Sequence, residues 1–221
     1  MSYSIVDTGG SRSFPAPHPL LAGAAPDGEV VILVGQDAGR ALARVKREGK
    51  AAVLVELGTE CLGVHTGESR GTEGSNVLGF ARFRLGDAEP SDLVELVRQP
   101  ATPAAAVDAA RKVLEGAGLR VSVCLDFAGR IVDRLVRPYY NATLRRLDEG
   151  LATADDLDTT LKLGLGYPEG PIALLERTGL AHHFDVTQAL FDAYGEQPYA
   201  PARRARVAKE RQARADRKER G

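Results

Sequence analysis

The chain has 221 residues, of which 43% are hydrophobic and 27% charged, so one large or two small globular domains are expected. Its formal net charge of -1 excludes a whole-chain attraction for nucleic acid or for an anionic membrane. Two cysteines are too few for a disulfide framework, and no apolar run reaches membrane-spanning length or follows a basic N-terminal region. We therefore expect a cytoplasmic protein with reduced thiols.

The first 28 residues are rich in glycine, proline, alanine and serine, which predicts a flexible leader with one short strand at residues 3–6. Ordered structure is expected from Glu29, where EVVILV is typical of a buried strand. A helix over residues 36–49 and a second buried strand, KAAVLVEL from Lys50, are expected next. This order is typical of a parallel βαβ unit.

The segment 61–76 is rich in turn-forming residues and has no clear period. Further along, Thr102 is predicted to cap an alanine-rich helix that has Pro103 at its first position and ends near Glu115. Three more strands are expected, at residues 77–85, 93–98 and 119–125. The α/β part of the chain is therefore expected to end near residue 125.

After Asp126 the pattern becomes helical. Apolar residues recur at helical spacing through residues 129–149, and Pro138 inside this run is predicted to kink the helix. Thr153 is predicted to cap the next helix, because two acids follow in its first turn. Two further helices are expected, near residues 171–178 and 180–194.

A basic tail closes the sequence, with nine lysines or arginines and three acids in residues 203–221. One interpretation is an arm that binds nucleic acid or an acidic partner. The other is a solvated, partly helical tail of mixed charge. We favour the second, because the tail contains no aromatic residue and no basic folded domain lies beside it in the sequence.

The stretch DFAGRIVDRLVRPYYNATLRRLDEGLATADDLDTTLKLGLGYPEGP, residues 126–171, resembles the C-terminal domain of 3-hydroxyacyl-CoA dehydrogenases. In that family the corresponding sequence is roughly PGFIVNRLLVPYLNEA, followed by an acidic turn and KLGLGYPMGP. The resemblance is clear over residues 93–199 and weak over 29–92. It implies an incomplete Rossmann-like domain at 29–125 and a helical 6-phosphogluconate-dehydrogenase-C-terminal-like domain at 126–200. The basic tail, at 201–221, lies beyond the resemblance.

The sequence departs from the family at the dinucleotide-binding turn. The family places a GxGxxG turn before a helix whose N-terminus receives the pyrophosphate of NAD. The corresponding turn here lacks the third glycine; it reads Gly35-Gln36-Asp37-Ala38-Gly39. The acid at Asp37 would repel a phosphate. Residues 29–57 resemble the later half of the family's first domain, so the first dinucleotide-binding half is expected to be missing. We therefore expect no bound cofactor.

The sequence also differs from the family at the catalytic residues that the resemblance implies. The family pairs a histidine with a glutamate that orients it. Glu95 in LVELV matches the glutamate, but no histidine lies between Val77 and Glu95, and Ala81 or Phe83 stands at the histidine position. The hypothesis is that Glu95 is a relic of a catalytic site.

The family's catalytic asparagine corresponds to Asp133, which as a carboxylate cannot donate the hydrogen bond that an amide donates. If the family geometry is kept, Asp133 lies near Glu95 in an inter-domain cleft, and one acid is protonated or paired with a cation such as Arg134. Thr59 is nearest in register to the family's catalytic serine. Glu95 and Asp133 are thus candidate catalytic relics, and Arg134 and Thr59 candidate substrate-binding residues.

The histidines offer few alternatives. His65 could replace the lost base, and Cys61 lies four residues before it, but two ligands are too few for a metal site. We interpret His65 as a surface loop residue and expect no metal. His182 and His183 begin a predicted helix, where a solvent-facing pair is expected.

Three functional hypotheses follow. The first is a degenerate dehydrogenase-family protein of acyl-CoA or fatty-acid metabolism, without independent NAD-dependent activity, that dimerises or binds an acyl-CoA or a partner enzyme. The alternative is an active divergent acyl-CoA enzyme, completed by a partner chain or using the carboxylates of Glu95 and Asp133. The third is a structural dimerisation module. Expected partners are a second copy, through the helical domain, and a complete dehydrogenase or other acyl-CoA enzyme, but neither a membrane nor nucleic acid.

Overall fold

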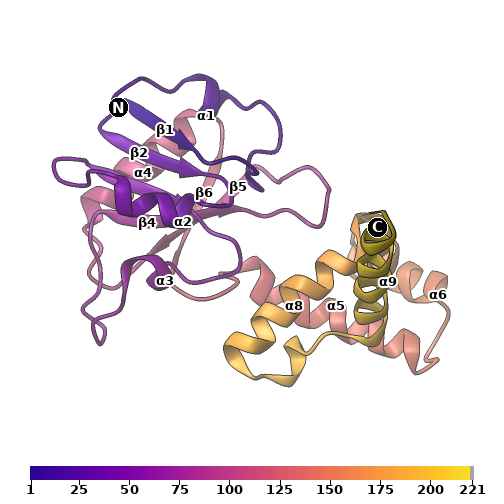
Figure 1. The fold of residues 1–221 in the computed structure, drawn as a ribbon. Helices are drawn as coiled ribbons and strands as arrows, with labels where there is room; N and C mark the ends of the chain where they lie inside the picture. Colours follow the sequence, from indigo (N-terminus) through magenta and orange to yellow (C-terminus); the bar gives the residue numbers. More distant parts are fainter. Residues whose placement is uncertain (220–221) are drawn as a thin grey trace. The chain divides into compact units, whose positions relative to one another are not determined.

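The computed structural model describes residues 1–219 and divides the chain into two compact units (Figure 1). The sheet unit comprises residues 1–84 and 89–131, and the helical unit comprises residues 85–88 and the chain from Val132 onward. The sheet unit therefore continues past the expected boundary at residue 125, to Ile131. No helix in the described chain has the length and apolar composition needed to cross a bilayer.

The sheet unit is built on six strands that neighbour one another in sequence order. Their bounds are β1 Tyr3–Asp7, β2 Val30–Val34, β3 Ala52–Glu56, β4 Val77–Arg82, β5 Leu93–Arg98 and β6 Arg120–Leu125. All neighbours are parallel except β4 and β5, which are antiparallel. The connection between these two is too short for a parallel crossover. The expected Rossmann-like sheet is thus confirmed, with one antiparallel pair.

Two apolar layers cover the sheet, and every residue of β2 and β3 is buried between them. Helix α4, Ala104–Gly116, packs one face with Ala110 and Leu114. On the other face the expected helix at residues 36–49 shrinks to α2, Ala38–Ala41, and a 3-10 turn, Leu42–Arg44. After Val45, the residues KREGK offer no apolar side chain to pack on the sheet, so nothing prolongs the helix.

The expected flexible leader is part of the sheet unit. The strand predicted at residues 3–6 forms as β1, in parallel register with β2 from Tyr3 opposite Val30. Phe14 and Leu20, the latter in the short helix α1, Pro19–Ala22, are buried in the core. Two apolar anchors therefore hold a segment whose composition alone indicated a loose chain.

Two smaller predictions need correction. The turn-rich segment 61–76 contains one short helix, α3, Gly63–Thr66. Thr102 does not cap α4: the N-cap is Pro103, and the hydroxyl of Thr102 instead accepts a hydrogen bond from the Gln99 amide at 3.0 Å.

The helical unit contains five α-helices within its described residues. They are α5 Val132–Asp148, α6 Ala154–Leu165, α7 Pro171–Thr178, α8 Leu180–Tyr194 and α9 Arg203–Glu219. Thr153 caps α6 as expected, its hydroxyl accepting from the Asp156 amide at 3.1 Å. The tail forms a helix, α9, that packs against α8, while residues 220 and 221 lie outside the described chain.

The turn GLGYPEGP joins α6 to α7 through a cap between the two helices. Gly166 ends α6 with a φ of +70°, which favours glycine. The carboxylate of Asp158, on α6, then accepts from the amides of Ile172 and Ala173, at 2.9 Å each, in the first turn of α7. A side chain at Gly170 would collide with Asp158. The glycine at position 170 therefore allows the Asp158 side chain to approach the start of α7 closely.

Candidate functional site

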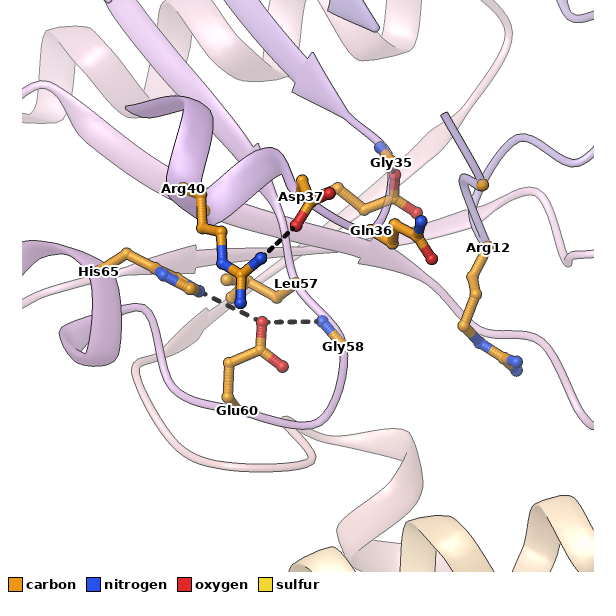
Figure 2. A pocket seen from close by; sticks show the side chains of 12 residues that line it. Arg12, Gly35, Gln36, Asp37, Arg40, Leu57, Gly58, Glu60 and His65 are labelled. Carbon is orange, nitrogen blue, oxygen red and sulfur yellow. Dashed lines mark hydrogen bonds and ion pairs between the residues drawn. The ribbon is translucent and has the colours of Figure 1, made fainter. Parts of the chain in front are cut away.

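A cavity of about 350 Å³ opens at the carboxyl ends of β2 and β3, in the sheet unit. Ligands of open α/β sheets bind at this edge. Its walls come from the loop after β1, the turn after β2, the start of α2 and the end of β3, together with His65 (Figure 2). The cavity is therefore a candidate ligand site of the sheet unit.

Glu56, the last residue of β3, is 7% exposed and joins three segments at this cavity. Its carboxylate accepts from the Ser11 hydroxyl at 2.8 Å, from the Ser13 amide at 2.7 Å and from the Gly35 amide at 2.6 Å. Sequence reasoning did not single out Glu56. A signal was available, since one acid ends an otherwise apolar buried strand.

His65 belongs to the cavity wall and is not a free surface residue. Its side chain is 19% exposed, and the ring packs against Gly39, where a side chain would collide with it. Its Nε2 lies 3.3 Å from Oε1 of Glu60, which also accepts from the Gly58 amide at 3.1 Å. Figure 2 shows these three residues beside the Asp37–Arg40 ion pair, whose atoms are 3.2 Å apart.

Glu95 is 2% exposed on β5 and is held by an arginine that the sequence did not indicate. Its Oε2 accepts from Nε of Arg130 at 3.2 Å, and its Oε1 accepts from the Ile131 amide at 2.8 Å. Arg130 also donates to the Gly58 carbonyl at 2.8 Å. The cation beside Glu95 in the sheet unit is therefore Arg130, where Arg134 or another cation was expected.

The register of β4 against β5 places Ala81 directly opposite Glu95. Residues paired in this way project from the same face of a sheet. Of the two residues considered for the histidine position, Ala81 is therefore the one beside Glu95. Its methyl group can neither accept nor donate a proton.

The other predicted site residues have separate environments. Asp133, in the helical unit, accepts from Nε of Arg137 at 2.7 Å. The guanidinium of Arg134 lies over the ring of Tyr194, 4.8 Å from its centroid. Thr59, in the sheet unit, accepts from the Gly129 amide through its carbonyl at 2.9 Å. Glu95 and Asp133 each have an arginine of their own unit, and their proximity stays a prediction.

A buried polar network surrounds His183 in the helical unit. His183 is only 1% exposed, so the expectation that it faces solvent was wrong. Arg137 donates to Nδ1 of His183 at 3.2 Å, so the ring proton is on Nε2, which donates to Asn141 at 3.0 Å. Burial, and then the charge of Arg137, lowers the pKa of His183 to about 3. His183, Thr187 and Leu190 share the buried face of α8, a spacing visible in the sequence.

His182, by contrast, is partly exposed and lies 3.4 Å from the carboxylate of Asp87. Cys61 and His65 do not form part of a metal-binding cluster: no group of three or more metal-ligating side chains occurs in residues 1–219.

Residues 129–220 match the family model described as 3-hydroxyacyl-CoA dehydrogenase, C-terminal domain. The 3-hydroxybutyryl-CoA dehydrogenase of Bradyrhizobium diazoefficiens is 33% identical over 110 residues, which are 50% of this chain and 38% of that protein. The mitochondrial hydroxyacyl-coenzyme A dehydrogenase of Homo sapiens is 36% identical over 104 residues, 47% of this chain and 32% of that protein. The matches thus span less than two fifths of these relatives.

Solved structures share the fold. The (S)-3-hydroxybutyryl-CoA dehydrogenase of Ralstonia eutropha aligns with a TM-score of 0.68 and 22% identity, covering 81% of this chain and 64% of that one. FadB2 of M. tuberculosis aligns with a TM-score of 0.68 and 24% identity, covering 84% of this chain and 67% of that one.

Proposed function

The chain belongs, through its helical part, to the 3-hydroxyacyl-CoA dehydrogenase family, and on that premise we propose that it is a degenerate member without independent NAD-dependent dehydrogenase activity. It works in acyl-CoA metabolism, in the cytoplasm, by binding: to a second copy, to a complete acyl-CoA enzyme or to an acyl-CoA.

The arrangement of Ala81, Glu95 and Arg130 carries this proposal. A dehydrogenase of this kind needs a base to take the hydroxyl proton as hydride leaves. The position opposite Glu95 bears only a methyl group, and the Glu95 carboxylate is paired with a guanidinium. Arginine stays protonated at any working pH, so Arg130 cannot take over as the base.

NAD, the cofactor implied by the family, does not fit the residues at the sheet edge. A pyrophosphate there needs free backbone N–H donors at the start of a helix. The amides of Ser13 and Gly35 are already bonded to Glu56, and α2 is one turn long with Asp37 before it. The Asp37 carboxylate also opposes an incoming phosphate, as the sequence indicated.

The surface of the helical unit supports a binding role. Four of its leucines are between 63% and 83% exposed, namely Leu135, Leu151, Leu163 and Leu165. Helix α6 has no buried residue at all among its described side chains. Exposed apolar side chains gathered on one unit are typical of interaction surfaces. The basic tail supports nucleic-acid binding less, because Arg203, Arg204 and Lys209 pair with acids of α5 and α8.

NADH oxidation with acetoacetyl-CoA, at high protein concentration, tests the proposal. We expect no turnover above that of buffer, with a complete dehydrogenase of the family as the positive control. Turnover that scales with the concentration of this protein would overturn the proposal.

The alternative is an active divergent acyl-CoA enzyme, completed by a partner chain. The contact between His65 and Glu60 in the cavity wall favours it, since a histidine beside a carboxylate can transfer protons. If turnover is found, His65→Gln should abolish it, while His182→Gln, a change at a histidine in the helical unit, should not.

A further inference from the structure

We propose that the carboxylate of Glu56 is a built-in anion that occupies an oxyanion site at the carboxyl edge of the sheet. It closes this edge to phosphate-bearing ligands. The inference deepens the proposed function, because it names the residue that would exclude a dinucleotide.

The site is formed by three donors from two segments. The Ser11 hydroxyl and the Ser13 amide come from the loop after β1, and the Gly35 amide comes from the turn after β2. They converge on both oxygens of one carboxylate at 2.6 to 2.8 Å, the short distances of charge-assisted hydrogen bonds. Backbone amides and a hydroxyl gathered at strand ends are the donors that hold phosphate oxygens in other α/β proteins.

The Glu56 carboxylate is held by these three hydrogen-bond donors. No lysine, arginine or histidine in residues 1–219 forms an ion pair with it. A buried carboxylate without a counter-ion requires such hydrogen bonds. The donors need it equally, because a buried N–H without an acceptor is costly. The carboxylate and its three donors therefore satisfy one another, and the Glu56 carboxylate occupies the site.

A phosphate that enters the cavity finds these three donors already bonded to the Glu56 carboxylate. Arg12 and Arg40 line the cavity with Glu56, and Arg40 is already paired with Asp37. A ligand phosphate could reach the Ser13 and Gly35 amides only after Glu56 had left them. Removing the Glu56 carboxylate should therefore open an anion site, whereas removing another acid of the same cavity should not.

Equilibrium dialysis with radiolabelled inorganic phosphate, at constant ionic strength, tests this in the full chain. The wild type should show no saturable binding. Glu56→Ala should bind about one phosphate per chain, and phosphate should raise its thermal midpoint above the value in matched chloride. Glu60→Ala removes the same charge from the same cavity without freeing the three donors, so it should behave like the wild type.

Three outcomes would overturn the proposal. They are saturable phosphate binding by the wild type, equal phosphate binding by the two alanine variants, and a Glu56→Ala protein that phosphate neither binds nor stabilises. If Glu56→Ala stays unfolded in phosphate as in chloride, the anion has not replaced the carboxylate, and the proposal fails equally. NADH turnover by the wild type would refute the proposed function separately, whatever phosphate does.

Discussion

Arg130 donates its Nε–H to Glu95 across 3.2 Å, and both side chains are buried, with 6% and 2% of their surfaces exposed. The pair lies beside Ala81, one of the two residues that the family resemblance places at the histidine position. Arg130 also has a φ of +52°, a conformation in which a non-glycine residue is strained. The buried charge of Glu95 is thus held by a cation and not by a titrating imidazole.

Removing this cation should destabilise the sheet unit. Arg130→Met removes the guanidinium from the buried Glu95 carboxylate, which should lower the free energy of unfolding by about 3 to 5 kcal/mol. Adding Glu95→Gln should recover a large part of the loss. Urea unfolding measures both, and Arg40→Ala, which removes an exposed ion pair, should cost at most about 1 kcal/mol. An Arg130→Met protein as stable as the wild type would show that the pair is not needed.

Stability should depend on pH through His183. Its pKa is about 3 in the folded protein and should return to its usual value near 6.5 on unfolding, because burial and Arg137 act only in the fold. The unfolded chain therefore binds a proton that the folded chain refuses. The stabilisation is complete above about pH 6.5 and falls by up to roughly 1.4 kcal/mol per pH unit as the pH drops towards 3.

Urea unfolding at several pH values measures this slope. His183→Gln should flatten it between pH 6 and about 4, even though the variant is less stable overall. His182→Gln, a change at the neighbouring, partly exposed histidine, should leave it unchanged. Equal slopes in the wild type and His183→Gln would contradict the assignment.

The cap between α6 and α7 should be measurable at Asp158. Asp158→Ala leaves the amides of Ile172 and Ala173 without their acceptor and should cost about 1 to 2 kcal/mol, the usual range for lost N-caps. Asp155→Ala, at an exposed acid of α6, should cost less than about 0.5 kcal/mol. Thermal unfolding of the two variants tests the difference, and similar midpoints would refute the cap's contribution.

Self-association should require the exposed leucines of α6. We expect a homodimer in light scattering after size exclusion, because an apolar surface of this kind gains from burial. Leu163→Lys should convert it to a monomer, since Leu163 is 83% exposed and its change should not disturb the fold. Ala193→Lys, on the exposed part of α8, should stay dimeric. A monomeric wild type would exclude the helical unit as a self-association surface.

Local patterns predicted most elements of the fold. The runs EVVILV and KAAVLVEL formed β2 and β3, and the periodic residues after Asp126 formed the helices with the Thr153 cap in place. The predictions failed where packing decides, as in the shortened helix after β2 and in the leader, whose Phe14 and Leu20 are buried in the core. A short strand can form from five residues once a neighbouring strand is present to bond it.

The sequence by itself determined most strands and helices, the family resemblance and the absence of a histidine between Val77 and Glu95, because these depend on residue types and short spacings. Only the tertiary structure decided which groups meet. Glu56 reaches the Ser13 amide across 43 positions of the chain, Arg130 reaches Glu95 across 35, and Arg137 reaches His183 across 46. Side chains this far apart are brought together by strand order and helix packing, so their partners cannot be read from local pattern.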